Sequence, residues 1–322
     1  MMVRTVLQPS YGEQCAKKPH LSQTGSMKLA WTIVSAAVAL ALIELAIRAV
    51  GLIDFPLYDI DEKIGYLPRP NQKGAFLRNR DWEYNELSMG SATFRPTPGR
   101  DILLIGDSIV NGGNPTRQQD RLGPKLQELE GVSVWAVSAG SWSLLNELAY
   151  LGSHHDVVEA VDEIIFVLNS KDFGDASTWT SDLTHPLRRP TYATAYVIRK
   201  YIYDWTKLTR RPQVDDAPMA DWKIELARLL EIESSRATKV TIVLFPTRSE
   251  MQSRSYAELE LHACALTNAG AKRILSVGRD ARWSAAYYRD NIHPTSEGNA
   301  VLAQIISRPM REAIVVDQSC PG

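Results

Sequence analysis

The stretch Ile102-Leu103-Leu104-Ile105-Gly106-Asp107-Ser108 decides the fold class of this chain. Four consecutive apolar residues predict a strand buried on both faces, and Gly106-Asp107 then breaks the run and presents Ser108 at the start of the next element. This arrangement holds a hydroxyl at the carboxyl end of a parallel sheet, where α/β proteins place their ligands. Such a turn is by itself more often a helix cap, so a chemical role for Ser108 requires a base and an oxyanion site from elsewhere in the chain.

Further apolar runs alternate with amphipathic helical patterns on the carboxyl side of Ser108. This alternation predicts crossover connections and a parallel sheet that is covered on both faces. We therefore expect an α/β fold, namely a three-layer α/β/α sandwich with a parallel five-stranded sheet. The expected strands cover residues 102–105, 132–137, 163–168, 239–245 and 273–277, and helical patterns follow at 122–129, 144–151 and 222–230.

The composition excludes several classes of partner. The chain has 322 residues, with 36 basic against 37 acidic side chains and a formal net charge of −1, so nothing indicates binding to nucleic acid. The three cysteines have no metal-ligand spacing and are too few for a disulfide framework. Cys264 and Cys320 could pair in an oxidising compartment, and free thiols are an equal alternative.

A long apolar segment at residues 29–53 predicts one transmembrane helix. About 25 residues suffice to cross a hydrocarbon core of ~30 Å. A cleaved signal peptide and a buried core helix are the alternatives. The charges that flank the segment predict a cytoplasmic amino end and a single-pass protein of the inner membrane, whose main domain lies outside the cytoplasm. These charges are Lys17, Lys18 and Lys28 before the span, and Asp54, Asp59, Asp61 and Glu62 after it.

The remaining segments follow from changes in composition. We expect a disordered cytoplasmic tail at 1–28, an extended connector at 54–100, the α/β domain at 101–310 and a tail at 311–322. Residues 174–219 form an insertion in this domain, which is a surface excursion, a lid over the site or a segment near the membrane. Either Met1 or Met27 is the true start of the chain.

A candidate base stands near the carboxyl end of the chain. Asp290 precedes His293 by three residues, on a loop that leads to the capping residue Ser296 and the last amphipathic helix. The carboxylate can reach the imidazole Nδ1 and fix its tautomer, which leaves the other nitrogen free to take a proton from a serine. In a parallel sheet this loop falls on the same carboxyl edge as Ser108.

The chain resembles the SGNH hydrolases of the GDSL esterase/lipase superfamily, and especially their membrane-anchored bacterial members. Four blocks carry the resemblance, in the family's order and within residues 101–307. They are Ile105-Gly106-Asp107-Ser108, Val137-Ser138-Ala139-Gly140-Ser141, Val167-Leu168-Asn169-Ser170-Lys171-Asp172 and Asp290-Asn291-Ile292-His293-Pro294. The resemblance implies an SGNH/flavodoxin-like fold. It also implies a catalytic triad of Ser108, His293 and Asp290, with an oxyanion hole that includes the backbone N–H groups of Ser108 and Gly140.

The third block departs from the family pattern. Lys171 stands where the family has its oxyanion asparagine, and Asn169 stands where it has a glycine. Either the Lys171 ammonium or the Asn169 amide could complete the oxyanion hole, since both would lie on one face if the strand continues.

The resemblance implies a membrane-anchored serine esterase that removes short, acetyl-type acyl groups from a small molecule, a carbohydrate or an envelope polymer. Two alternatives are an O-acyltransferase that acts on an exported polysaccharide and a catalytically weak binding protein with the same fold. We expect no cofactor and no metal, since the histidines form no ligand cluster.

Overall fold

The structure is a computed structural model that describes residues 23–202, 220–236 and 238–307. The chain divides into two compact units, Met1–Leu45 and Ala46–Gly322. The tail expected at residues 311–322 and most of the tail expected at 1–28 lie outside the described residues. Residues 23–28 already belong to a helix, because polar residues can extend a helix that the apolar segment has nucleated.

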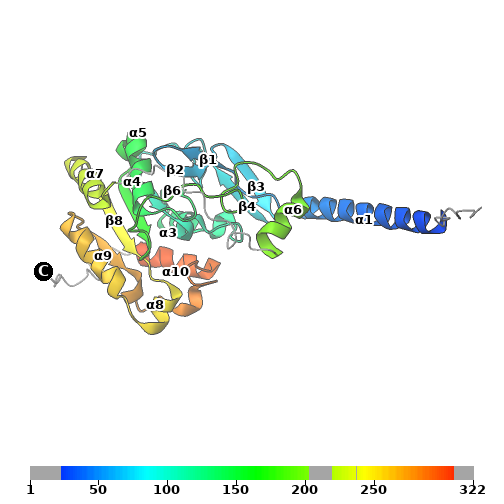
Figure 1. Cartoon of the computed structure of the whole chain (residues 1–322). Coiled ribbons are helices and arrows are strands. Elements are labelled where there is room, and N and C mark those ends of the chain that lie inside the picture. The colour runs from blue at the N-terminus through cyan, green and yellow to red at the C-terminus, as the bar shows by residue number, and fades with distance from the viewer. Residues whose placement is uncertain (1–22, 203–219, 237, 308–322) are drawn as a thin grey trace, which may run out of the picture. The chain divides into compact units, whose positions relative to one another are not determined.

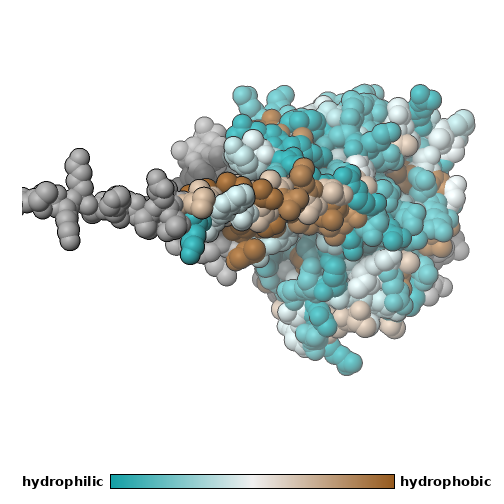
Figure 2. Space-filling model, turned by 90° about the vertical axis from the view of Figure 1, so that its right-hand side faces the viewer, coloured by the Kyte–Doolittle hydropathy of each residue, from teal (hydrophilic) through white to brown (hydrophobic). Residues whose placement is uncertain are grey.

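Helix α1 (Gln23–Ala49) contains the predicted membrane segment. Its part from Met27 to Ala49 reaches a mean hydropathy of 2.1, none of that apolar stretch is buried, and by length and composition it could cross a membrane. The exposed side chains of the helix include Leu29, Trp31 and Leu45. Figure 2 shows a brown, hydrophobic surface of this kind. The helix ends four residues earlier than the sequence indicates, and Gly51 follows with a left-handed φ of 73°.

A parallel five-stranded sheet forms the centre of the second unit, and Figure 1 labels two of its strands, β6 and β8. The strand order is β6-β5-β7-β8-β9. The predicted α/β fold class with a parallel sheet is therefore confirmed. The strand order reverses at β5, which lies between β6 and β7, and ligands bind beside such a reversal at the carboxyl ends of the strands. The strands are β5 (Asp101–Gly106), β6 (Ser133–Ser138), β7 (Glu163–Leu168), β8 (Lys239–Leu244) and β9 (Ile274–Ser276).

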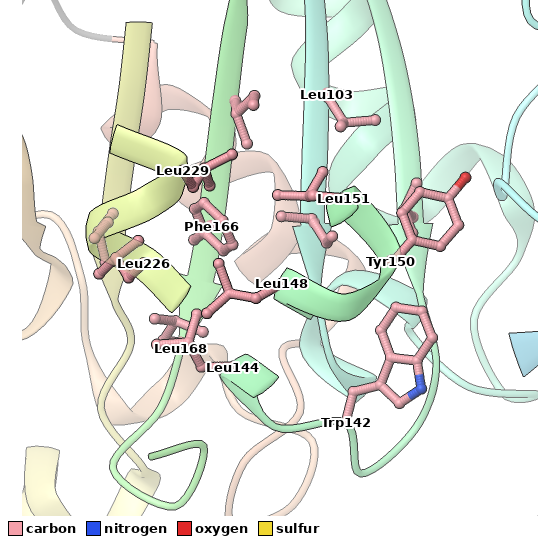
Figure 3. Packing of buried hydrophobic residues seen from close by; sticks show 14 of the residues in the cluster. Leu103, Trp142, Leu144, Leu148, Tyr150, Leu151, Phe166, Leu168, Leu226 and Leu229 are labelled. Atoms are coloured by element: carbon pink, nitrogen blue, oxygen red, sulfur yellow. The ribbon is translucent and has the colours of Figure 1, made fainter. Parts of the chain in front are cut away.

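Both faces of the sheet are covered by helices, because alternate residues of each strand point to opposite faces. In β5, Leu103 and Ile105 pack with one hydrophobic cluster, and Ile102 and Leu104 pack with the other. Figure 3 shows the first cluster, in which leucines of α4 and α7 pack around Phe166 of β7. The first face carries α4 (Leu144–Ser153), α5 (His155–Ala160), α7 (Trp222–Arg236) and α9 (Ala257–Asn268), and the second carries α3 (Leu122–Glu130) and α10 (Ser296–Ile306).

The segment expected to be an extended connector contains two antiparallel hairpins. They pair β1 (Tyr58–Asp61) with β2 (Gly65–Pro68), and β3 (Gln72–Phe76) with β4 (Arg80–Tyr84). Tyr58, Tyr66 and Met89 are buried in the main hydrophobic cluster, so this segment is part of the domain core. Strands of four or five residues among prolines and glycines carry too little alternation to be read from sequence.

The insertion at residues 174–219 is described only up to residue 202. It contains α6 (Ala193–Val197), which continues into a π-helical turn, η2 (Ile198–Ile202). Tyr196 of α6 packs with Phe55, which comes soon after α1 in the chain.

Cys264 lies on α9 and is disulfide-bonded. Cys15 and Cys320 lie outside the described residues. The pairing of Cys264 with Cys320 therefore stays a prediction.

Candidate active site

The candidate nucleophile, Ser108, is the first residue of α2 (Ser108–Asn111) and directly follows the turn after β5. The Asp107 carboxylate caps this short helix by accepting the N–H of Ile109 at 2.8 Å. A methyl group on Gly106 would lie only 2.6 Å from Cγ2 of Val110, so only glycine lets the helix approach the strand this closely. The turn holds Ser108 partly exposed at the carboxyl end of the sheet, as the sequence predicts.

The predicted Asp290–His293 pair is present. Nδ1 of His293 lies 2.8 Å from Oδ2 and 3.0 Å from Oδ1 of Asp290. Since a carboxylate accepts hydrogen bonds, Nδ1 carries the hydrogen and Nε2 is left as the basic nitrogen. Partial burial acts to raise the pKa of Asp290, but hydrogen bonds from the N–H groups of His293 and Ile292 and from the imidazole outweigh it and lower that pKa to about 2.

The loop that carries His293 is tied to the segment after Ser108. The Arg289 guanidinium donates to Oγ1 of Thr116 at 3.0 Å, and the Asn299 amide donates to the carbonyl of Asp120 at 2.8 Å. The following helix, α10, is capped by Thr295, one residue before the Ser296 that we expected. The cap shifts because the Thr295 hydroxyl accepts the N–H of Gly298.

Ser108 and His293 lie in one neighbourhood but share no hydrogen bond. The charge of His293 is near enough to lower the pKa of Asp107, the residue next to Ser108. Oγ of Ser108 has a long contact of 3.4 Å to Oδ2 of Asp107. Catalytic hydrogen bonds often tighten only when substrate binds, so this geometry is compatible with Ser108 and His293 acting together.

The side chain of Asn169 is buried, and its amide nitrogen donates hydrogen bonds to two carboxyl groups. Its amide nitrogen donates to Oδ2 of Asp172 at 2.7 Å and to Oδ2 of Asp107 at 3.3 Å, which occupies both of its hydrogens. Asn169 therefore links the turn after β7 to the turn that holds Ser108. The Lys171 side chain is exposed, and its ammonium group has no hydrogen-bond or ion-pair partner within the described ranges.

Three buried carboxyl groups, Asp107, Glu147 and Asp172, lie near one another in this part of the site, and Glu147 is the one that lies outside the four sequence blocks. Burial raises the pKa of Asp107 to about 6, although the Ile109 N–H and His293 act to lower it. Burial and the charge of Asp107 raise the pKa of Asp172, and burial with both neighbouring charges raises the pKa of Glu147. Neither oxygen of Glu147 has a hydrogen-bond partner in the part of the chain that the structure describes. Burial therefore disfavours the charged form of all three carboxyl groups near the nucleophile turn.

The glycine block forms a tight turn after β6. The N–H of Trp142 donates to the carbonyl of Ala139 at 3.3 Å, which closes the turn around Gly140 and Ser141. Ser141 has a left-handed φ of 64°. Within the described ranges, the N–H groups of Gly140 and Ser141 have no acceptor, so both are available to a ligand. The structure thus brings Ser108, Gly140, Asn169 and Lys171 to one sheet edge, each following a strand that pairs with a neighbour.

Among solved structures, this chain is similar to SGNH/GDSL hydrolases and carbohydrate esterases. A lipolytic protein of the G-D-S-L family from Veillonella parvula DSM 2008 is 12% identical with a TM-score of 0.36, over 64% of this chain and 96% of its own. An acetyl xylan esterase, AlAXEase, is 10% identical with a TM-score of 0.38, over 64% and 97%. A carbohydrate esterase family 2 enzyme from Corynascus thermopiles is 14% identical with a TM-score of 0.38, over 67% and 66%.

No protein-family model matches the chain, and no curated protein matches it. The assignment of chemistry therefore depends on the geometry of the site.

Proposed function

We propose that this chain is a membrane-anchored serine esterase in which Ser108 is the nucleophile. The observation that carries the proposal is the Asp290–His293 pair, whose 2.8 Å contact leaves Nε2 as the basic nitrogen. The charge of His293 also acts on Asp107, the residue before Ser108, which supports a role for the two residues together. An esterase of this kind needs a hydroxyl, a base with a fixed tautomer and free backbone donors, and the described residues supply all three.

The proposed mechanism has two halves. Oγ of Ser108 attacks the ester carbonyl while Nε2 of His293 takes its proton, and the same nitrogen then protonates the leaving alcohol. Water, activated by His293, next attacks the acyl-enzyme and releases the acid. The oxyanion accepts hydrogen bonds from the backbone N–H groups of Ser108 and Gly140.

The third oxyanion donor is assigned to Lys171 rather than Asn169. Both amide hydrogens of Asn169 already bond to carboxylates, whereas the exposed Lys171 ammonium has no partner in the described part of the chain. Asn169 then acts as a positioning residue that holds Asp107 and Asp172. Losing a donor of this kind typically costs about 10²–10³ in rate.

The substrate class is a short acyl ester on a carbohydrate or envelope polymer, and an acylated small molecule is the alternative. This choice follows from the expected placement of the domain outside the cytoplasm, which the charges around α1 predict. Protease protection in sealed inner-membrane vesicles tests the placement: a domain on the cytoplasmic side would contradict it.

The activity is tested on the full chain in detergent, with p-nitrophenyl acetate as substrate and a fluorophosphonate as active-serine label. Wild type should turn over and label, and Ser108→Ala should do neither. Ser249→Ala is the matched control, because Ser249 bonds to Asn291 beside the His293 loop at 2.7 Å but has no base, and it should keep the label. A wild-type protein that neither turns over nor labels would refute the esterase proposal.

Lys171 also raises an O-acyltransferase as a second candidate, since the altered oxyanion block is the point at which this chain departs from the hydrolase pattern. The test adds a soluble oligosaccharide acceptor to the assay. A transferase should move acetyl to the sugar faster than to water. If Lys171→Ala keeps the full rate of both reactions, the donor role of Lys171 is wrong.

A further inference from the structure

The carbonyl oxygen of Gly140 accepts two side-chain hydrogen bonds from distant parts of the chain. The Tyr66 hydroxyl donates to it at 2.6 Å, and Nε2 of His185 donates at 2.9 Å. Tyr66 belongs to β2 in the first hairpin, and His185 belongs to the insertion at residues 174–219. Two segments outside the four sequence blocks thus converge on the glycine whose N–H we assign to the oxyanion hole.

The hydrogen on His185 can be assigned from its partner. A carbonyl oxygen only accepts, so Nε2 is the protonated nitrogen and Nδ1 is bare. Nδ1 is buried and has no hydrogen-bond partner within the described ranges. Burial lowers the pKa of His185 to about 4, although its bond to Gly140 acts in the opposite direction. His185 is therefore a neutral, single-tautomer donor at ordinary pH.

Both donors are held in place by packing. The Tyr66 and His185 rings lie 4.2 Å apart, and Tyr58 contacts His185 edge-on at 4.8 Å. The indole N–H of Trp142 donates to the carbonyl of Tyr66, and that of Trp179 donates to the carbonyl of His185, each at 2.7 Å. The two indole bonds hold the backbone at Tyr66 and His185, and the ring contacts restrain the rings themselves.

The two hydrogen bonds to the Gly140 carbonyl favour one of the two orientations that the peptide between Gly140 and Ser141 can adopt. Ser141, the third residue of this turn, adopts φ 64°. A positive φ at the third residue is required in a type II turn and usually favours glycine or asparagine. The peptide between Gly140 and Ser141 is trans, so its C=O and N–H point in opposite directions. Holding the C=O against Tyr66 and His185 therefore turns the Ser141 N–H away from them. A flipped peptide would reverse both groups and relieve the strain at Ser141.

We propose that Tyr66 and His185 are positioning residues that lock the Gly140–Ser141 peptide in the form whose Ser141 N–H faces the reacting ester, beside the Gly140 N–H. This inference rests on the proposed esterase function. Without the lock, the flipped turn would present a carbonyl oxygen beside the developing oxyanion, and repulsion between the two oxygens would raise the barrier.

The test uses the full chain in detergent and separates the donor from the ring. Tyr66→Phe and His185→Phe keep an aromatic ring but lose the donor, whereas His185→Gln keeps an N–H near the position of Nε2. We expect kcat to fall about 10–100-fold in both Phe variants with KM changed less than threefold, and His185→Gln to recover most of the loss. Tyr150→Phe is the matched control, because it removes another buried tyrosine hydroxyl that bonds to a backbone carbonyl, that of Leu87 at 2.8 Å, away from the site.

The control should lose thermal stability without a change in kcat. If Tyr66→Phe and His185→Phe behave like this control, or raise KM alone, the positioning role is wrong. Hydrogen exchange of the peptide that contains Gly140 and Ser141 gives a readout that needs no turnover. Faster exchange in the Phe variants but not in His185→Gln supports the lock even if wild type proves inactive, and unchanged exchange overturns it.

Discussion

Asp107 and Asp290 are two carboxyl groups of the candidate site, and their surroundings move their pKa values in opposite directions. Asp107 is buried, and burial raises its pKa to about 6. Asp290 is half exposed, and the hydrogen bonds that it accepts bring its pKa down to about 2 despite partial burial. Asp290 therefore stays charged over the whole working range and suits the role of orienting His293.

Replacing Asp290 by asparagine should separate this role from any structural one. The new amide oxygen can still accept the N–H groups of Ile292 and His293, but the side chain no longer fixes the tautomer or stabilises the imidazolium, so kcat should fall about 10³–10⁴-fold. The thermal unfolding midpoint should change by less than about 2 °C, since the side chain is half exposed. Steady-state kinetics and thermal scans measure both quantities. An Asp290→Asn variant within tenfold of wild-type kcat would remove Asp290 from the triad.

Individual residues differ in how far the sequence reveals them. The sequence predicts Ser108, Asp290 and His293 as site residues, because each lies in a short motif and the motifs follow the order found in the family. Glu147 and His185 have no such pattern: Glu147 looks like one polar residue of an amphipathic helix, and its burial depends on what covers α4. The state of Asn169 depends equally on tertiary contacts, because Asp107 lies 62 positions away in the sequence.

At the scale of elements, long apolar runs predicted the central strands well. β7 has the predicted bounds, since a strand buried on both faces is apolar throughout. The hairpins at Tyr58–Pro68 and Gln72–Tyr84 escaped prediction, because their short strands gain stability by packing on the domain rather than from their own pattern.

The junction between β5 and α2 gives a prediction at this scale. Gly106→Ala places a methyl group 2.6 Å from Cγ2 of Val110 and 3.0 Å from the carbonyl of Val167, so α2 or β7 must move. We expect a loss of about 1–3 kcal/mol in stability and a reduced rate of Ser108 labelling. Gly152→Ala is the control: Gly152 lies in helix α4 with nothing within 4 Å of the added methyl group, and the higher helix propensity of alanine should leave stability unchanged or raise it. Equal unfolding midpoints for the two variants would refute this account of the junction.

At the scale of the whole molecule, three segments that the sequence separates meet at one carbonyl group. The hairpin that carries Tyr66, the insertion that carries His185 and the core block that carries Gly140 form one hydrogen-bonded unit. Sequence patterns describe each segment alone, so neither the fold class nor the family resemblance indicates that they meet. The convergence gives the hairpin and the insertion a role in the site, in addition to their role in the core.

This unit makes stability depend on pH in a direction set by His185. Its pKa is about 4 in the folded chain against an ordinary value of 6.5, so the folded state resists protonation. The stabilisation is fully present above pH 6.5 and is lost as pH falls towards 4, to a total of about 3 kcal/mol. Asp107 acts with the opposite sign: its raised pKa gives stability that is complete below its ordinary value of 3.8 and is lost as pH rises through 6. The two effects overlap, so the slope of wild type alone does not isolate His185.

Comparison with His185→Gln isolates it, because glutamine keeps the donor to Gly140 but does not titrate. Between pH 7 and pH 4.5 the unfolding midpoint of wild type should fall by about 5–10 °C more than that of the variant. His155→Gln, a change at an exposed histidine, should follow wild type at every pH. If the unfolding midpoints of wild type and His185→Gln fall in parallel with pH, His185 takes up a proton in the folded state as readily as in the unfolded state. Nδ1 would then take up the proton in the folded state, and Nε2 would still donate to the Gly140 carbonyl from the charged ring.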